Sequence, residues 1–305
     1  MKRRFQADLS LGFCSLIWGV TFVLVKSALA DASVFAFLVF RFALATLALA
    51  LIYRAAVRRL DRATLAAGAI IGSFMFAGYA FQTIGLQYTT PSKAAFITGA
   101  SVVMVPVLHA VIGRRRAGGW VWAGAIAAFG GLYFLTIPSA GLGGLNKGDL
   151  WVLGCAVMWA FHILLVGHYS PRHSVGALTF TQVAVSGALS ALFLPLLWAA
   201  GMEAPRVAWS GTVIAAVLVT AVGATAFAFS IQVWAQRFTT PSHVAILFSL
   251  EPVFAAFTSV IFYGERLTGR TLAGAALVLA GILFAELKGA APAAPEEATP
   301  GPGAA

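Results

Sequence analysis

Two residues of opposite charge, Arg41 and Glu251, stand inside long apolar stretches of the sequence. Arg41 is the ninth residue of its stretch and Glu251 the eleventh, so in helices that rise ~1.5 Å per residue both would lie near the middle of a membrane. Charged groups are costly at that depth and mark sites of function. Two interpretations stay open. Either the two residues form a structural ion pair, or Glu251 carries a proton and Arg41 serves as its counter-ion or as a ligand for a carboxylate.

A second group of residues recurs along the chain at nearly constant separations. Trp18 recurs 141 positions later as Trp159, and Gln82 recurs 150 positions later as Gln232. Polar residues on one stripe of a membrane helix often join helices to one another. As a set on corresponding helices, these side chains predict a site that stacks a ring or an apolar group beside hydrogen-bonding amides. The predicted substrate-binding residues are Trp18, Arg41, Tyr79, Gln82, Trp159, His162, Gln182 and Gln232.

The tetrapeptide TTPS occurs twice, at residues 89–92 and 239–242. In each copy a Thr can cap a helix and the Pro suits the first helical position, so both copies predict a helix start. The next residues are Lys93 and His243, although a cation is disfavoured at the positive end of a helix. Either Lys93 extends its charge to the lipid headgroups, or Lys93 and His243 attract an anionic group to the two mouths of one pathway.

Two prolines stand within the apolar stretches. Pro252 directly follows Glu251, and Pro106 lies in an earlier stretch. Proline removes one helical hydrogen bond and bends the helix, while neighbouring helices can satisfy the freed carbonyl group. We therefore expect both prolines to act as hinges that shape a cavity.

The sequence lacks the common motifs of nucleotide-binding proteins, hydrolases and metal sites. The stretch GLGGLNKG at 141–148 does not match a phosphate-binding loop, because Lys147 is followed by Gly148 and not by Ser or Thr. It contains no Gly-x-Ser-x-Gly, His-Glu-x-x-His or Cys-x-x-Cys pattern. We therefore expect no enzyme activity, no cofactor and no metal.

The elements that must position these residues are membrane-spanning helices. The chain has 305 residues, of which 60% are hydrophobic and 10% charged, and its mean hydropathy is +0.91. Apolar runs of about 20 residues, the length that crosses a ~30 Å hydrocarbon core, occur ten times. These runs are 9–29, 33–53, 65–87, 91–113, 119–137, 149–169, 175–198, 207–234, 241–263 and 269–287. The sequence therefore predicts an all-α integral membrane protein with ten transmembrane helices.

The recurring positions indicate that the chain consists of two related halves. Each half contains five spans, an odd number, so the second half enters the membrane from the opposite side. The result is a five-plus-five inverted repeat, which is typical of secondary transporters with alternating access. The predicted segments are an N-terminus at 1–8, a first repeat at 9–137, a connecting loop at 138–148, a second repeat at 149–287 and a disordered tail at 288–305.

The positive charges of the loops predict how the chain is oriented. With the N-terminus in the cytoplasm, thirteen Lys and Arg residues lie in loops on that side and six on the other, so both termini are expected to be cytoplasmic. The first stretch also resembles a cleavable signal peptide. Because its Asp8 and Cys14 recur as Asp149 and Cys155, we expect it to be retained. This orientation explains the net charge of +10, and no nucleic-acid partner is expected.

Several segments together resemble the EamA family of the drug/metabolite transporter superfamily. They are LIWGVTFVLVK at 16–26, FLVFR at 37–41, the tight turns before residues 91 and 241, and EPVFAAFTSVIFYGERL at 251–267. The resemblance covers about residues 8 to 287. The pair formed by Gly264 and Glu265 occurs in the second half only, so we expect Glu265 to act within its own loop.

The resemblance implies an exporter of small metabolites, commonly amino acids, aromatic ones among them, or amphipathic organic compounds, through a central cavity lined by both halves. A flippase or a carrier of lipid-linked or nucleotide sugars with the same fold is the alternative. The expected partners are a small-molecule substrate and the lipid bilayer of a bacterial inner membrane. The protein is expected to be a monomer, with a homodimer through glycine-rich helices as the second option.

Overall fold

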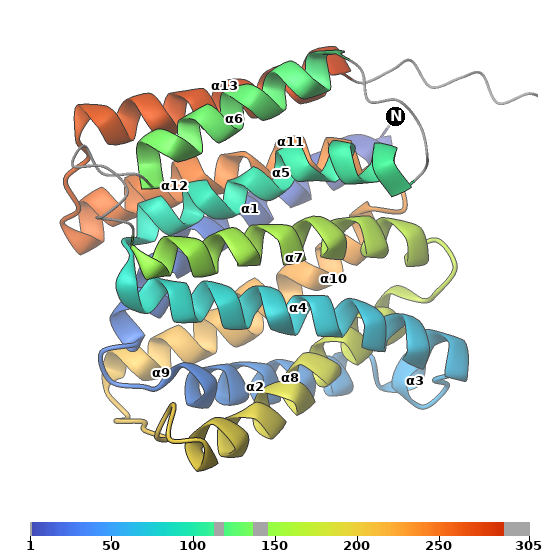
Figure 1. The fold of residues 1–305 in the computed structure, drawn as a ribbon. Coiled ribbons are helices and arrows are strands. Elements are labelled where there is room, and N and C mark those ends of the chain that lie inside the picture. The colour runs from blue at the N-terminus through green and yellow to red at the C-terminus, as the bar shows by residue number, and fades with distance from the viewer. Residues whose placement is uncertain (1, 113–118, 137–145, 290–305) are drawn as a thin grey trace, which may run out of the picture.

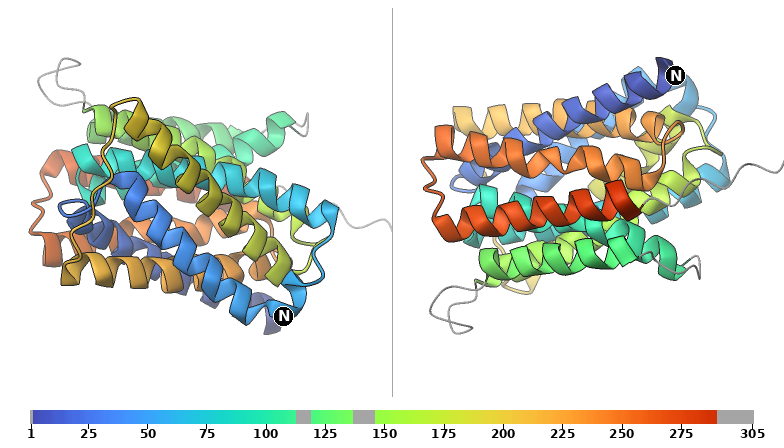
Figure 2. Two further views of the ribbon diagram at one scale, coloured as in Figure 1. Left: turned by 90° about the horizontal axis from the view of Figure 1, so that it is seen from below. Right: turned by 90° about the horizontal axis from the view of Figure 1, so that it is seen from above.

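The chain folds into a bundle of long helices that run side by side (Figures 1 and 2). The computed structural model describes residues 2–112, 119–136 and 146–289. The predicted loop at 138–148 and the predicted tail at 288–305 therefore lie largely outside the described residues. The helices are α1 (Lys2–Ala28), α2 (Val34–Ile52), α3 (Arg54–Val57), α4 (Arg62–Tyr88), α5 (Pro91–Ile112), α6 (Gly119–Thr136), α7 (Lys147–Tyr169), α8 (Val175–Ala199), α9 (Gly211–Leu218), η2 (Val219–Phe227), α10 (Ala228–Ala235), α11 (Pro241–Phe248), α12 (Leu250–Thr258), η3 (Ser259–Tyr263) and α13 (Gly269–Gly289).

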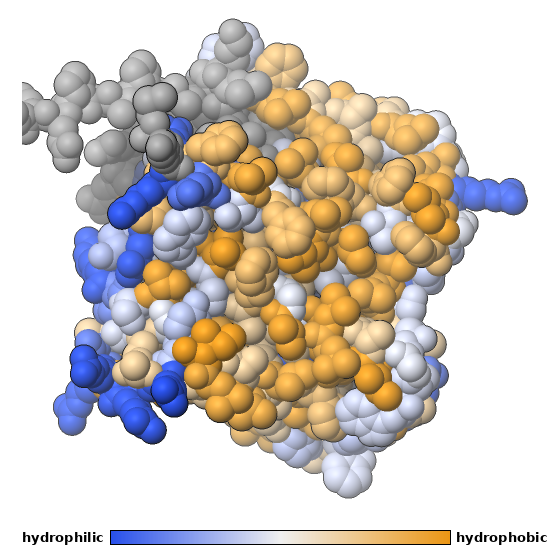
Figure 3. All heavy atoms as spheres, turned by 180° about the vertical axis from the view of Figure 1, so that it is seen from behind, coloured by the Kyte–Doolittle hydropathy of each residue, from blue (hydrophilic) through white to orange (hydrophobic). Residues whose placement is uncertain are grey.

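The sides of the bundle carry a broad apolar band. Among the described residues, seven helices are long and apolar enough to cross a membrane, and three further apolar helices are shorter, at 122–135, 250–263 and 269–281. Hydrophobic side chains cover most of the face seen in Figure 3, and hydrophilic ones gather mainly at the end that carries the N-terminus. An apolar surface of this extent requires lipid contact. The protein is therefore a multi-pass membrane protein.

The helices follow the predicted apolar runs with local differences. Helix α1 begins at Lys2, so residues expected to form a separate N-terminal segment continue the first helix. The run predicted at 207–234 is helical only from Gly211 and contains nine residues of π-helix, η2. A π-helical segment shifts the hydrogen-bond pattern and often accompanies a functional site. Here η2 supplies two polar contacts to the central residues described below.

Of the two predicted hinge prolines, Pro252 coincides with a break between helices. Proline cannot donate a hydrogen bond to the carbonyl group four residues earlier, and α11 ends at that residue, Phe248. Helix α12 starts again at Leu250. Pro106 lies inside the continuous helix α5, so the expected hinge at Pro106 does not appear as a break in this structure.

Helices α4, α5 and α7 form one closely packed group, which we call the α4 unit. A Cβ atom added to Gly85 of α4 would lie 2.8 Å from the carbonyl oxygen of Gly148 in α7, so this glycine lets the two backbones touch. The Thr98 hydroxyl of α5 lies 3.8 Å from the Cys155 sulfur of α7. These contacts fix the three helices to one another.

A second group, the α1 unit, consists of α1, η2, α10, α11, α12 and η3, together with Glu265, whose backbone N–H donates to the carbonyl oxygen of Ser259 in η3 at 3.2 Å. A Cβ atom added to Gly19 of α1 would lie 2.8 Å from the carbonyl oxygen of Glu251 in α12. The Ser15 hydroxyl donates to the carbonyl oxygen of Leu247 in α11 at 3.0 Å. Each unit therefore combines helices of both predicted halves: α1 packs with helices of the second half, and α7 packs with helices of the first.

Helices α6 and α13 pack mainly on each other at one edge of the bundle (Figure 1). A Cβ atom added to Gly131 would lie 2.6 Å from the carbonyl oxygen of Gly274, and one added to Gly281 would lie 2.5 Å from that of Gly124. Small residues allow such close approach in membranes. At these positions the glycines serve a contact within the chain, which was the first of the two uses expected from the sequence.

Replacing Gly281 by Ala is expected to lower the melting temperature of the detergent-solubilised protein, because the new methyl group would meet the backbone of α6. Overpacking of this kind costs about 1–3 kcal/mol. Gly130 of α6 provides a matched control, since a Cβ atom added there meets no atom within 4 Å. Gly130→Ala should leave the melting temperature unchanged, and an unchanged value for Gly281→Ala would contradict the close packing.

Candidate functional site

A cavity lies between the α4 unit and the α1 unit. It holds about 570 Å³ of space not filled by atoms, counting its open mouth. The α4 unit contributes Tyr79, Gln82, Thr98, Gly99, Ser101, Val102, Trp159 and Ile163, and the α1 unit contributes Trp18, Thr21, Phe22, Phe229, Gln232, Phe248 and Glu251. The cavity thus brings together six residues singled out from the sequence, which are Trp18, Tyr79, Gln82, Trp159, Gln232 and Glu251.

Aromatic rings form the apolar wall of the cavity. Trp159 meets Tyr79 edge-on, with ring centroids 4.9 Å apart, and lies nearly parallel to Phe229 at 6.0 Å. Trp18 meets Phe248 edge-on at 4.9 Å. Edge-to-face and offset arrangements of this kind are favoured by the ring quadrupoles. The rings hold one another in place and offer faces on which a flat or apolar group can stack.

The polar side of the cavity contains amides, hydroxyls and one carboxylate. The Gln232 amide nitrogen donates to the Gln236 amide oxygen at 3.1 Å, and the Gln236 nitrogen donates to the carbonyl oxygen of Ile163 at 3.0 Å. This chain of bonds fixes Gln232. Among the described residues that line the cavity, only Glu251 carries a formal charge. The described part of the lining contains no lysine, arginine or histidine.

Arg41 lies behind the cavity wall and not on it. Its side chain is 2% exposed, its Nε donates to the Thr225 hydroxyl of η2 at 3.0 Å, and its guanidinium carbon lies 4.0 Å from the centroid of the Tyr79 ring. Its Nη2 is buried without a hydrogen-bond partner. Within the described part of the chain, no ion pair joins Arg41 to Glu251, so the structural ion pair is not formed in this conformation.

Arg41→Lys is expected to reduce the transport activity that the sequence predicts by about tenfold, because a lysine cannot donate to Thr225 and also place a planar cation on the Tyr79 ring. A desolvated cation–π contact is worth up to about 2 kcal/mol. The measurement is the initial rate of substrate uptake by proteoliposomes. Thr225→Val removes only the hydrogen bond and should have a smaller effect. Equal rates for Arg41→Lys and the wild-type protein would show that the stacked guanidinium is dispensable.

His162 and Gln182 bond to each other outside the cavity. The His162 Nε2 and the Gln182 amide oxygen are 2.9 Å apart, and both side chains are fully buried. The His162 ring meets Trp159 edge-on at 5.2 Å and Phe229 at 5.5 Å. In this structure the pair packs behind the aromatic wall and does not line the cavity, although the sequence predicted both residues as part of the site. His162 lies about one helical turn from Trp159, but that spacing does not show whether its side chain reaches the cavity. The aromatic rings form the wall of the cavity, and His162 lies behind them.

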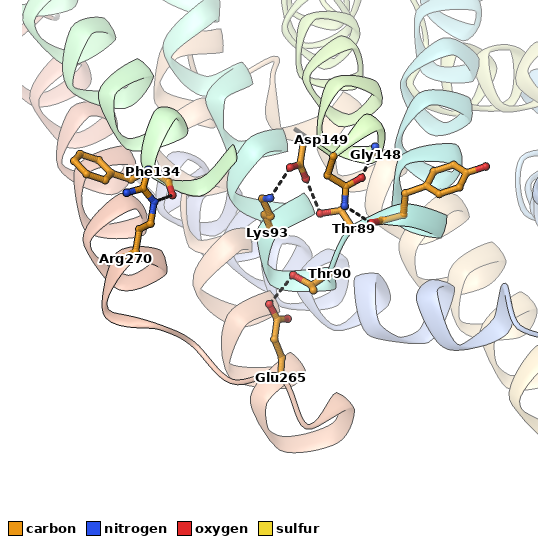
Figure 4. Close-up of polar contacts among 10 residues, drawn as sticks. Thr89, Thr90, Lys93, Phe134, Gly148, Asp149, Glu265 and Arg270 are labelled. Atoms are coloured by element: carbon orange, nitrogen blue, oxygen red, sulfur yellow. Dashed lines mark hydrogen bonds and ion pairs between the residues drawn. The ribbon is translucent and has the colours of Figure 1, made fainter. Parts of the chain in front are cut away.

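Lys93 is paired with an acid at the far face of the bundle, which we define as the end opposite the N-terminus, where α4 ends and α5 and α7 begin. Its ammonium group lies 2.5 Å from Asp149, and the Thr89 hydroxyl donates to the same carboxylate at 2.6 Å. Figure 4 shows both side chains pointing to Asp149. Because its charge is compensated, Lys93 does not fit the expected attraction of an anion. The side chain of His243 lies outside the described residues.

Glu265 reaches beyond its own loop, which corrects the expectation from the sequence. Gly264 has a φ of 69°, a left-handed conformation that glycine adopts without strain, and it turns the chain after η3. Glu265 then accepts a hydrogen bond from the Thr90 hydroxyl, just before α5 (Figure 4). It accepts another from the Ser92 hydroxyl in the first turn of α5. Glu265 occurs in the second half only, yet it binds residues of the first half. It can do so because the fold places the end of η3 beside the start of α5.

Three aromatic residues that line the cavity were not predicted from the sequence: Phe22, Phe229 and Phe248. A phenylalanine in an apolar run looks the same whether it faces lipid or a cavity. One signal was present for Phe229, which follows the predicted site residue Tyr79 by 150 residues. Extending the repeat to apolar positions would have found Phe229, whereas the repeat partners of Phe22 and Phe248 were not predicted site residues either.

Comparisons with known proteins show what the chain resembles in sequence and fold. A model of the EamA-like transporter family matches residues 7–137 and 146–287. An uncharacterized transporter of Archaeoglobus fulgidus is 36% identical over 286 residues, which are 94% of this chain and 87% of the relative. The threonine/homoserine exporter RhtA of Escherichia coli (strain K12) is 28% identical over 165 residues, which are 53% of this chain and 52% of the exporter. One solved crystal structure shares the fold, with a TM-score of 0.67 and 20% identity over 93% of this chain and 97% of the other.

Proposed function

Because this chain belongs to the EamA-like transporter family, we propose that it exports small amphipathic metabolites, amino acids among them, by alternating access through the cavity. The observation that carries the proposal is a single carboxylate, Glu251, set among aromatic rings and two glutamines that come from both units. Such a site fits a ligand with an ammonium group, a hydrogen-bonding group and an apolar part. Amino acids have this chemistry, and the RhtA relative is named an exporter of threonine and homoserine.

Pairs of cavity residues support a five-plus-five inverted repeat. In an inverted repeat, equivalent residues face one central site from opposite sides. The pairs separated by 141 residues are Trp18 with Trp159 and Phe22 with Ile163, and those separated by 150 residues are Tyr79 with Phe229, Gln82 with Gln232, Thr98 with Phe248 and Ser101 with Glu251. The seven long and three short apolar helices fit ten spans of this kind.

Glu251 is the proposed coupling residue. Desolvation favours the neutral carboxyl, whereas a bound ammonium group favours the carboxylate. A proton and a substrate ammonium group therefore compete for Glu251, and entry of one proton can be exchanged for exit of one substrate. The equivalent position of the other half is Ser101, which cannot carry a proton, so the coupling depends on one unit only.

Arg41 takes a second role in this proposal. It is a buried cation with an unpartnered Nη2, separated from the cavity by the Tyr79 ring on which it stacks. A movement of Tyr79 would expose the guanidinium group to the cavity, where a substrate carboxylate would satisfy it. We also propose a bacterial inner membrane as the location, and the bias of positive charge in the loops supports cytoplasmic termini.

The test is uptake by proteoliposomes that contain the purified protein. A panel of labelled amino acids, including threonine, homoserine and the aromatic ones, is supplied with and without an imposed pH gradient. We expect selective uptake that rises with the gradient and that unlabelled substrate inhibits. Empty liposomes give the background.

Two other outcomes have defined meanings. Uptake of an amino acid that is indifferent to the gradient would support the carrier and contradict proton coupling. No uptake of any amino acid, together with movement of a fluorescent lipid-linked sugar between leaflets, would replace the proposal by the flippase alternative.

A further inference from the structure

A lysine of the α1 unit holds the end of α4, which belongs to the α4 unit. The ammonium group of Lys26 donates to the carbonyl oxygens of Leu86 at 2.6 Å and Gln87 at 3.2 Å. These carbonyl groups belong to the last turn of α4 and have no partner within the helix. A cation at this end of a helix is also favoured by the helix dipole. Lys26 therefore gives both carbonyl oxygens a hydrogen-bond donor, and the same contact connects the α1 unit to the α4 unit.

A glutamate of the α1 unit binds the start of α5, so an anion lies at this helix end where a cation lies at the end of α4. Glu265 accepts from the Thr90 hydroxyl at 2.6 Å, from the Ser92 hydroxyl at 2.5 Å and from the Ser92 backbone N–H at 3.3 Å. It also accepts from Ser259 in η3. An acid is favoured at the N-terminus of a helix, where backbone N–H groups are unpaired. The short turn between α4 and α5 is thus held by a cation on one side and an anion on the other.

We propose that Lys26 and Glu265 together, which we call the turn clamp, are the gate that closes the substrate pathway at the far face. Both residues belong to the α1 unit, and their partners between Leu86 and Ser92 belong to the α4 unit. The pathway runs between these units, since the cavity walls come from both. The inference rests on the proposed alternating access, and it identifies the contacts that must break when the far face opens.

The position of the turn clamp fits a gate. Phe22 and Gln82 line the cavity. Lys26 follows Phe22 by four residues, and its partner Leu86 follows Gln82 by four residues, so on both helices the clamp lies one turn beyond the cavity on the same face. The clamp therefore closes the space directly between the binding site and the far face.

The neighbouring ion pair serves as a contrast. Lys93 and Asp149 are both in the α4 unit, on α5 and α7, and their charges meet within that unit. Movement of the two units against each other does not require this pair to break. Only contacts between the units can act as a gate. The turn clamp meets this condition, and the ion pair of Lys93 and Asp149 does not.

The test measures access to the cavity and does not depend on transport. Gln82→Cys places a thiol in the cavity wall, and an impermeant thiol reagent is added to sealed vesicles from each side in turn. Cys14 and Cys155 are fully buried, so the protein without the new cysteine gives the background. Combining Gln82→Cys with Lys26→Met and Glu265→Gln is expected to raise the rate of labelling from the far face at least about fivefold, because the closed state loses its stabilising contacts.

Controls distinguish opening of the gate from general loosening. Thr89→Val removes a bond to Asp149 within the α4 unit and should leave the labelling rate unchanged. Glu265→Asp keeps the charge but shortens the reach, so it should also raise the rate. Size-exclusion profiles show whether each variant is folded. The proposal would be overturned if the variant with Lys26→Met and Glu265→Gln and the variant with Glu265→Asp were both labelled at the rate of the protein with Gln82→Cys alone, even if amino-acid uptake is found.

A reversible cross-link provides the complementary test. Ser92→Cys with Glu265→Cys, joined by a short reducible bifunctional reagent, should block labelling of a cavity thiol and block uptake until a reductant is added. Tyr88→Cys with Asn146→Cys is the matched pair within the α4 unit, where the Asn146 amide donates to the carbonyl oxygen of Tyr88. Cross-linking this second pair should change neither the labelling of the cavity thiol nor uptake. Full labelling and uptake with the first pair cross-linked would exclude a gate at this place.

Discussion

Replacing Glu251 by Gln is expected to abolish the acceleration of uptake by a pH gradient. Glutamine keeps the size and hydrogen-bonding oxygen of the side chain but cannot exchange a proton or carry the charge that binds an ammonium group. Gradient-driven uptake should fall to about a tenth of the wild-type rate or less, which corresponds to about 1.4 kcal/mol or more. The measurement is the initial uptake rate in proteoliposomes at several imposed gradients.

Glu203 provides the matched control for this prediction. It is a half-buried acid between α8 and α9 whose carboxylate accepts from the backbone N–H of Phe35 at 2.8 Å, and burial raises the pKa of its carboxyl group. It lies outside the cavity, so Glu203→Gln should keep the response to the gradient. If Glu251→Gln responded to the gradient as the wild-type protein does, Glu251 would have no part in coupling.

Replacing Trp159 by Ala is expected to reduce uptake at least about tenfold, because the ring is the centre of the aromatic wall and each aromatic pair contributes about 0.5–1.5 kcal/mol beyond its buried area. Trp159 contacts Tyr79 on one side and lies nearly parallel to Phe229 on the other. Without it both rings lose their support and the substrate loses a stacking face. The effect should appear mainly as a higher KM, measured from uptake at increasing substrate concentration.

Trp151 is the control for the second prediction. It belongs to the same helix, α7, but its side chain is 40% exposed at the lipid-facing surface. Trp151→Ala should leave KM unchanged. Trp159→Phe keeps a ring and should recover part of the lost uptake. A KM for Trp159→Ala equal to that of Trp151→Ala would show that the wall does not bind substrate.

The helices were predictable from the sequence because their cause is local. A membrane helix needs a long apolar run, and each run in this chain corresponds to a helix or to a helix with an interruption. The interruption near Pro252 has a local chemical reason as well, since proline lacks the N–H that would donate to the carbonyl group four residues earlier in the helix. The π-helical segment η2 was not predicted, and its residues accept hydrogen bonds from Trp18 and Arg41 of other helices.

The candidate site was predictable in part. Polar and aromatic residues that recur in both halves were identified, and Trp18, Tyr79, Gln82, Trp159, Gln232 and Glu251 share one cavity. Arg41, His162 and Gln182 have the same chemical character but lie behind the wall. Residue type and depth in the membrane indicate importance, but they do not specify the direction in which a side chain points.

By itself, the sequence determined that this protein is an all-helical membrane protein and which residues could form a polar site within it, because hydrophobic length and the cost of buried charge are properties of each segment alone. Only the tertiary structure decided which helices pack together and which charges meet. It joined Lys93 to Asp149 within one unit and set Lys26 and Glu265 across the boundary between two. The physical reason is that pairing depends on distances of a few ångströms between segments far apart in the chain, and these follow from how glycines and small residues let particular helices approach.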